Sequence, residues 1–121
     1  MKNQNLELEI NLLHERICSA LGDTTRIMIL YLLAEKALFV NEIADTLGAP
    51  QSTISRHLRI LRERKLVDTE REGTSVRYSL TDIRIIQALD ILRTLLNDQI
   101  KAEAAITRTT EENYEIKEIN K

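Results

Sequence analysis

Apolar residues recur at spacings of three and four along most of the chain, which is the period of an amphipathic helix. Residues 6–21 carry such a stripe, formed by Leu6, Ile10, Leu13, Ile17 and Leu21. Residues 24–36 are apolar on most sides, so we expect this segment to be the central buried helix. Asp23 comes immediately before it, and its carboxylate can accept hydrogen bonds from the free amides of the first helical turn.

A short third helix and a longer fourth helix are predicted on either side of a tight turn. The third covers residues 40–48, where Gly48 suits the left-handed backbone conformation that ends many helices. Pro50 stops that helix from continuing and suits the first position of the next one. The fourth helix is expected from about residue 50 to residue 65. Its apolar strip, which should face the core, consists of Ile54, Leu58 and Leu61.

The apolar period changes to two over residues 66–80, which is typical of β-strands. Gly73 lies between the two alternating runs, where a positive φ costs glycine little, so a two-stranded hairpin is predicted. Thr81 is expected to cap a long fifth helix. The stripe of this helix consists of Ile83, Ile86, Leu89, Leu92, Leu96 and Ile100. The pattern then weakens, so we divide the chain into a domain at 1–105 and a polar, acidic tail at 106–121 that is prone to fraying.

Composition narrows the class of protein. Hydrophobic residues make up 43% of 121 residues, enough for one small core, and pairing with a second copy would help to stabilise so small a domain. Cys18 is the only cysteine, so no internal disulfide forms, which suits a reducing cytoplasm. No stretch reaches the ~18 apolar residues of a membrane span. We therefore expect a soluble, cytoplasmic protein without a membrane partner.

The third helix, the turn and the fourth helix form a helix-turn-helix pattern, which places one helix in the major groove of DNA. Short hydrogen-bonding side chains stand at the start of the fourth helix, where base edges are reached first, and arginines follow along one side. The residues expected to read bases are Gln51, Ser52, Thr53, Ser55 and Arg56. Arg59 and Arg62 lie further along, where phosphates or the second strand would be.

The charge distribution supports a nucleic-acid partner. Residues 51–78 hold seven basic and four acidic side chains, a net charge of +3, although the whole chain has a net charge of −2. The basic excess therefore coincides with the fourth helix and the hairpin, where contacts to phosphates would position the protein.

The order of these motifs resembles the winged-helix ArsR/SmtB family of bacterial repressors. The resemblance rests on "ALGDTTRIMILYLL" (20–33), "VNEIADTLGAPQSTISRHLRIL" (40–61) and "LVDTEREGTSVRYSL" (66–80). It implies a mainly α fold with a small β-hairpin, a winged helix-turn-helix of order α-α-α-α-β-β-α that dimerises through its first and last helices. It also implies a wing that contacts DNA through Thr74, Ser75 and Arg77.

At three places the sequence departs from the family pattern, so the family's DNA contact or metal site at that place is not expected in this chain. Many members have a serine or asparagine where this chain has Pro50, so any phosphate contact made by that side chain is absent here. The family's thiolate site is a cysteine pair, and this chain has Val40 and Asn41 there. The last helix contains aspartates but no histidine, so the family's other metal site lacks its nitrogen ligands. We therefore expect no metal and no cofactor.

Cys18 and His14 are the remaining candidates for sensing, because they stand four residues apart on the first helix. Cys18 is either a redox-active thiol, or half of a metal site completed by a partner subunit, or a small buried cysteine beside a surface histidine. The last alternative is the commoner state of a free cysteine. His57 has no ligand partner three or four residues away, so packing or a hydrogen bond to a neighbouring element is expected instead.

The leading hypothesis is a homodimeric repressor that binds an inverted-repeat DNA operator and is released by a small-molecule or redox inducer. The alternative is a winged helix that binds proteins and has lost DNA binding, and the arginines of the fourth helix count against it. An enzyme is not expected, because the sequence has no phosphate-binding glycine loop and no convincing pair of nucleophile and base.

Overall fold

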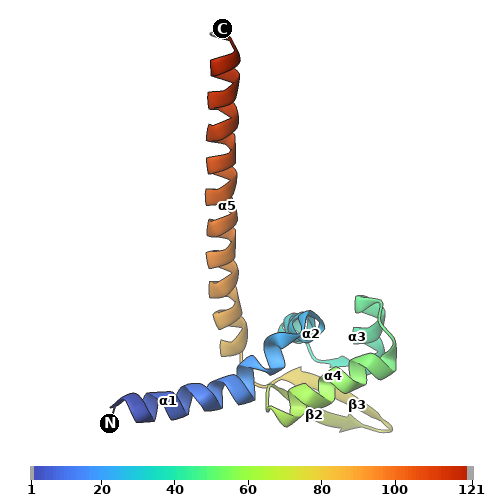
Figure 1. The fold of residues 1–121 in the computed structure, drawn as a ribbon. Helices are drawn as coiled ribbons and strands as arrows, with labels where there is room; N and C mark the ends of the chain where they lie inside the picture. The colour runs from blue at the N-terminus through green and yellow to red at the C-terminus, as the bar shows by residue number, and fades with distance from the viewer. Residues whose placement is uncertain (1, 120–121) are drawn as a thin grey trace. The chain divides into compact units, whose positions relative to one another are not determined.

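The computed structural model describes the backbone of residues 2–119 and the side chains of residues 3–111 (Figure 1). The helices and strands in chain order are α1 (Lys2–Leu13), η1 (His14–Cys18), η2 (Ala20–Gly22), α2 (Thr24–Glu35), β1 (Leu38–Phe39), α3 (Val40–Leu47), α4 (Gln51–Glu63), β2 (Val67–Glu72), β3 (Ser75–Leu80) and α5 (Arg84–Ile119). The chain divides into two compact units, residues 1–86 and 87–121. The predicted fold class is confirmed: the protein is mainly helical, with a helix-turn-helix and a small antiparallel sheet.

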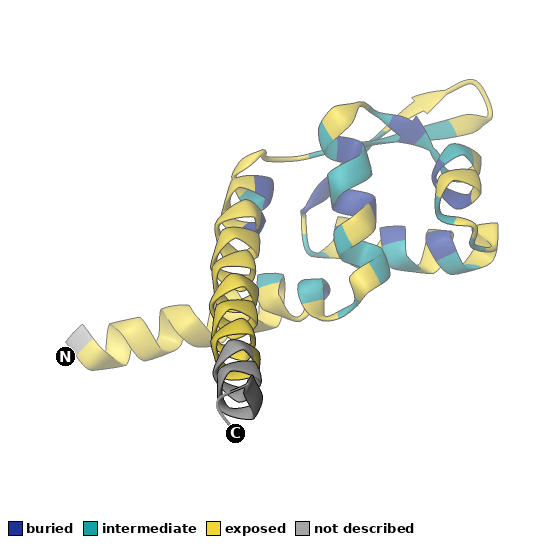
Figure 2. Cartoon of the chain, turned by 90° about the horizontal axis from the view of Figure 1, so that it is seen from above, coloured by how far each residue is buried: buried dark blue, intermediate teal, exposed yellow. Residues whose placement is uncertain are grey.

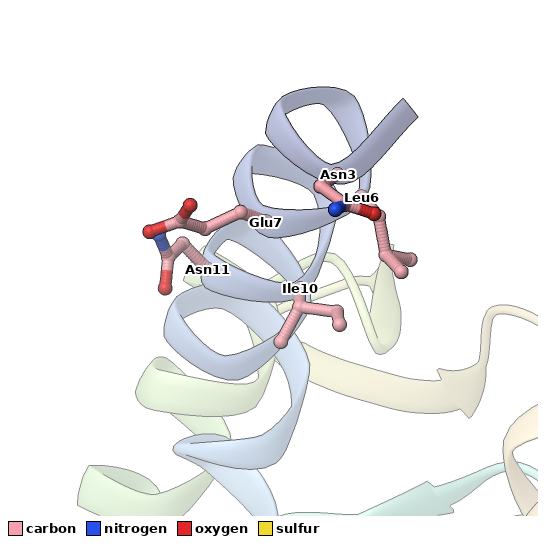
Figure 3. A pocket seen from close by; sticks show the side chains of 5 residues that line it. All are labelled: Asn3, Leu6, Glu7, Ile10 and Asn11. Carbon is pink, nitrogen blue, oxygen red and sulfur yellow. The ribbon is translucent and has the colours of Figure 1, made fainter. Parts of the chain in front are cut away.

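The first predicted helix is not continuous. α1 ends at Leu13, and the five residues after it form one π-helical turn in which the Ser19 amide donates to the His14 carbonyl oxygen at 2.9 Å. The short 3₁₀ turn η2 follows. Figure 3 shows Leu6 and Ile10 projecting from α1, away from Glu7, and each of these two apolar side chains is about half exposed (53% and 51%). The predicted apolar stripe therefore exists, but it is not covered.

Local hydrogen bonds set the boundaries of α2. The Asp23 carboxylate accepts from the Thr25 amide at 2.8 Å, which confirms the predicted cap and is the main reason why the pKa of Asp23 lies below its usual value. Ile29, Leu30 and Leu33 of this helix are buried. α2 is therefore the central core helix that its uniformly apolar sequence predicts.

The turn between α3 and α4 follows the prediction at Gly48 and differs at Pro50. Gly48 has φ +63° and ends α3 in the left-handed conformation. Pro50 is extended (φ −61°, ψ 144°) and stands just before α4, at the cap position rather than at the first helical position that proline suits. Its side chain makes no capping hydrogen bond, and its carbonyl oxygen accepts from the amides of Thr53 and Ile54, both at 3.1 Å.

The sheet has three strands, in the order β1-β3-β2, so the predicted two-stranded hairpin was incomplete. β1 pairs with β3 through Leu38 opposite Tyr78 and Phe39 opposite Arg77. A strand of two residues is too short to show alternation, which is why the sequence pattern did not predict it. The turn of the hairpin is as expected, with Gly73 at φ +62°.

The core of the first unit lies between α2, α3, α4 and the sheet, where the buried positions in Figure 2 are concentrated. The most completely buried large side chains are Ile29, Leu30, Ile43, Ile54, Leu58, Leu61 and Val67. All are aliphatic, as the low aromatic content of the chain requires.

α5 is capped one residue later than predicted. The Asp82 carboxylate, not Thr81, accepts from the Arg84 amide (2.9 Å). The same carboxylate also accepts from the Arg84 guanidinium, whose Nη2 is 2.7 Å away. These hydrogen bonds, of which those from the side chain have the larger effect, lower the pKa of Asp82 to about 2. The Thr81 amide instead donates to the Leu66 carbonyl oxygen at 3.1 Å, which closes the end of the hairpin.

The helix continues to Ile119, so the segment predicted as a polar tail has a helical backbone as far as that residue. Of the four glutamates expected to make the tail acidic, Glu111 is exposed, and Glu112, Glu115 and Glu118 lie outside the described side chains. α5 exposes a row of large apolar side chains: Ile91, Leu92, Leu95, Leu96, Ile100 and Ile106. Although α5 has 36 residues, neither it nor any other described helix is apolar enough to cross a membrane.

Candidate nucleic-acid interface

The outer face of α4 carries the side chains that the sequence predicts to read DNA. Gln51, Ser52, Ser55 and Arg56 are exposed, and Thr53 is half-buried. The opposite side of the same helix is fixed to the core, because Ile54, Leu58 and Leu61 are 0% exposed. The helix therefore presents a polar face from a rigid support.

The hydroxyl and guanidinium groups gather on one side of α4. Ser52, Ser55, Arg56 and Arg59 line one shallow surface hollow, as their spacing of three and four residues requires. Arg62 is exposed one turn further along. Among the described side chains the structure records no ion pair for Arg56, Arg59 or Arg62, so none of those side chains neutralises their positive charge.

The wing is less simply basic than the sequence suggests. Thr74 and Ser75 are exposed at the tip of the hairpin, whereas Arg77 is half-buried. The Arg77 guanidinium lies over the Phe39 ring, 4.8 Å from its centroid, and its Nη2 is 3.0 Å from a carboxylate oxygen of Glu72. Its Nε is buried and has no hydrogen-bond partner among the residues that the structure describes.

Acidic side chains share this face of the sheet. Glu70 stands directly opposite Arg77 in the register of the hairpin, and Asp68 and Glu72 lie two residues to either side of Glu70. Because alternate residues of a strand point to the same face, the three carboxylates form a row beside the single arginine. A phosphate that approaches Arg77 on this face would therefore have carboxylates close by.

His57 makes a hydrogen bond to a neighbouring element, one of the two roles expected of it. Its Nδ1 is 3.3 Å from Nη1 of Arg26, which belongs to α2. Both side chains are partly buried. This contact joins the middle of α4 to the core helix behind it.

Cys18 and His14 are both exposed, so the alternative of a buried cysteine was wrong for this chain. Both residues belong to the π-helical turn, where the hydrogen bond spans five residues rather than four, so the spacing argument from an α-helix does not apply. Among the described side chains, no group of three or more His, Cys, Asp or Glu residues is arranged to hold a metal ion.

Sequence reasoning missed the roles of Arg26, Phe39 and Glu72. A signal existed for Arg26, because a lone charged residue inside an apolar helix needs polar partners when it is partly buried. Phe39 and Glu72 meet Arg77 only through the pairing of the three strands, which the sequence pattern does not reveal.

The chain was compared with known proteins. Residues 23–69 match the family model described as "Bacterial regulatory protein, arsR family". The chain is 43% identical over 77 residues to the uncharacterized HTH-type transcriptional regulator MJ1325 of Methanocaldococcus jannaschii, and the match covers 63% of this chain and 86% of that protein. It is 40% identical over 67 residues to the HTH-type transcriptional regulator KmtR of Mycobacterium tuberculosis, covering 55% of this chain and 52% of KmtR. The chain therefore spans about half the length of KmtR.

Solved structures show the same architecture. The homodimeric winged helix-turn-helix DNA-binding domain of Mb0332 from Mycobacterium bovis superposes with a TM-score of 0.68 at 26% identity, covering 78% of this chain and 87% of that one. The transcriptional repressor BigR from Xylella fastidiosa gives a TM-score of 0.67 at 28% identity, covering 78% of this chain and 96% of that one.

Proposed function

The chain belongs to the arsR family of bacterial regulatory proteins, and from that premise we propose that it is a homodimeric transcriptional repressor that binds an inverted-repeat operator in double-stranded DNA. The observation that carries the proposal is the outer face of α4, where exposed serines and arginines stand on a helix whose other side is buried.

The chemistry of this face supports a division of roles. Gln51 and Arg56 have side chains that can make two hydrogen bonds to one purine edge, and a good pair of this kind discriminates between bases by ~1–3 kcal/mol. Ser52, Thr53 and Ser55 supply shorter donors and acceptors beside them. Arg59 and Arg62 lie further along α4 and are proposed to contact phosphates, as are Thr74, Ser75 and Arg77 of the wing.

A second copy of the chain is the proposed partner. α1 and α5 each expose an apolar row, and exposed apolar stripes of this length usually mark an interface. The similar domain of Mb0332 is homodimeric. A dimer would present two α4 helices to successive major grooves, about 34–36 Å apart, which is the spacing of an inverted repeat.

Repression in the cytoplasm is the proposed mode of action, supported by the similarity to the repressor BigR. Release from DNA is proposed to follow a signal other than a metal at the family's usual sites. The exposed thiol of Cys18 supports oxidation as that signal, because exposure is the first requirement for a reactive cysteine. No catalytic activity is proposed.

Binding to random-sequence duplex at low salt tests the proposed function against the alternative of a protein-binding module. We expect a gel shift that disappears as salt rises, because contacts to phosphates release counterions. The double substitution Arg56→Ala and Arg59→Ala should abolish the shift. A wild-type protein that leaves the duplex unshifted at 50 mM salt would support the protein-binding alternative instead.

A further inference from the structure

Arg26 is the centre of a set of hydrogen bonds that joins three segments of the first unit. Its Nε donates to the Ala20 carbonyl oxygen at 2.6 Å, and its Nη2 to the Ser19 carbonyl oxygen at 3.3 Å. Its Nη1 lies 3.3 Å from Nδ1 of His57. One guanidinium on α2 therefore contacts both the end of the N-terminal helical segment and the middle of α4.

The contact with α4 depends on the chemistry of the His57 ring. Arg26 can only donate, so Nδ1 must accept through its lone pair and the ring proton must be on Nε2. A guanidinium carries its donors in a fixed plane, so the positions of the two carbonyl oxygens restrict where the third donor points. The place of His57 is thereby tied to the backbone at Ser19 and Ala20.

His57 stands beside the residues that are proposed to read DNA. It follows Arg56 directly and is two residues before Arg59 on the same helix. A rotation of α4 about its axis would move these side chains together, because their positions on the helix surface are fixed relative to that of His57. A small error in such a rotation would affect contacts to base edges more than contacts to phosphates, because hydrogen bonds need close geometry and charge attraction does not.

We propose that Arg26 is a positioning residue that holds α4 in its base-reading orientation through His57, and that it couples this orientation to the turn at Ser19 and Ala20. The proposal rests on the proposed function, and it adds a route by which a change at the N-terminal helical segment would reach the DNA-reading face.

The test uses the full chain with two probes. One probe is a duplex recovered by selection from a random pool, and the other is a random-sequence duplex of the same length. Arg26→Lys, His57→Leu and their combination are compared with the wild type by fluorescence anisotropy. Each single variant should weaken binding to the selected duplex by about tenfold or more, the size expected when a hydrogen bond to a charged group is lost. Binding to the random duplex should change less than about twofold, because phosphates dominate it.

Two features distinguish positioning from a general loss of structure. The double variant should be no weaker than the weaker single variant, because both substitutions remove the same contact. His57→Asn, whose side-chain oxygen can take the place of Nδ1, should restore at least half of the lost discrimination between probes. Arg16→Lys makes the same chemical change at an exposed arginine of the π-helical turn and should leave both affinities unchanged.

Equal losses on both probes, or single-variant losses that multiply in the double variant, would overturn the proposal. Failure of the proposed function gives a different result, namely a wild-type protein that selects no duplex. In that case the same variants are compared by denaturant unfolding. A non-zero coupling between positions 26 and 57 still supports the link, and additive effects overturn it.

Discussion

The guanidinium carbon of Arg77 lies 4.8 Å from the centroid of the Phe39 ring, so β1 and β3 are joined by a side-chain contact as well as by their backbone pairing. The same guanidinium is 3.0 Å from Glu72. An arginine that the sequence assigns to phosphate binding is thus already engaged by an aromatic face and a carboxylate of its own sheet. A DNA phosphate would have to compete with Glu72 for it.

Removing the Glu72 charge should release Arg77 for DNA. Glu72→Gln is expected to tighten binding to random-sequence duplex about twofold or more. It should also steepen the dependence of log K on log salt by up to about 0.9, the value for one additional phosphate contact. Arg77→Ala should have the opposite effect on both quantities, with all sequences weakened about equally. Anisotropy titrations over a range of salt concentrations measure both.

Asp68→Asn is the matched control for Glu72→Gln, because it removes the same charge from the same strand and face. The structure records no ion pair between Asp68 and Arg77 within the described residues. Similar gains in affinity and in salt dependence for the two variants would mean that Glu72 acts only through its charge, not through its contact with Arg77.

The apolar row of α5 should hold two copies of the chain together. Leu96→Glu places a charge in a row that is otherwise apolar, and burying it against a partner without a counter-charge is costly. We expect self-association to weaken tenfold or more in analytical ultracentrifugation. Thr94→Glu introduces the same charge at an exposed polar position of the helix and serves as the control. A Leu96→Glu protein that sediments like the wild type would exclude this row from the interface.

Oxidation of Cys18 should weaken binding to the selected duplex. The thiol is exposed and is followed by Ser19, whose carbonyl oxygen accepts a hydrogen bond from Arg26. Peroxide should therefore lower the affinity of the wild type several-fold, through a sulfenic acid or a disulfide between copies, and leave Cys18→Ser unaffected. Anisotropy measured before and after peroxide, and again after reduction, follows the change. An equal response of the two proteins would end the redox hypothesis.

The cap of α5 should make stability depend on acid. Because the Arg84 side chain and amide lower the pKa of Asp82 from 3.8 to about 2, its ionised form stabilises the folded state. This contribution is fully present above about pH 4 and is lost as the pH falls toward 2. Asp82→Asn keeps an oxygen for the Arg84 amide but removes the charge. Its melting temperature should be a few degrees lower at pH 6, and the difference should shrink below pH 4. A difference that stays constant from pH 6 to pH 2.5 would contradict the assignment.

Local chemistry was enough to predict much of the fold. Asp23, Gly48 and Gly73 each perform the task that their residue type favours, and the strip of Ile54, Leu58 and Leu61 is buried as its spacing requires. The short strand β1 and the π-helical turn were missed for different reasons. The strand exists only because β3 pairs with it, and a π-turn leaves no distinct signature in a stripe that spans it.

In the candidate site, too, the sequence predicted which residues are exposed but not which residues they contact. The exposed residues of α4 could be named from the sequence, because a helical period determines which side faces away from the core. The surroundings of Arg77 and His57 could not, since Phe39 and Arg26 approach them only through packing between elements that are distant in sequence. Spacing predicts which face a residue occupies, whereas its partners depend on the tertiary arrangement.

The outer face of α4 is proposed to read bases. Selection of bound sequences from a random duplex pool, performed with the wild type and with Arg56→Ala, tests this proposal most directly. We expect the wild type to select an inverted repeat with half-sites one helical turn, about 10–10.5 base pairs, apart. We also expect Arg56→Ala to lose preference at one position in each half-site and to retain the rest. Recovery of the same sequence preference by both proteins, or of no preference by the wild type, would contradict the proposal.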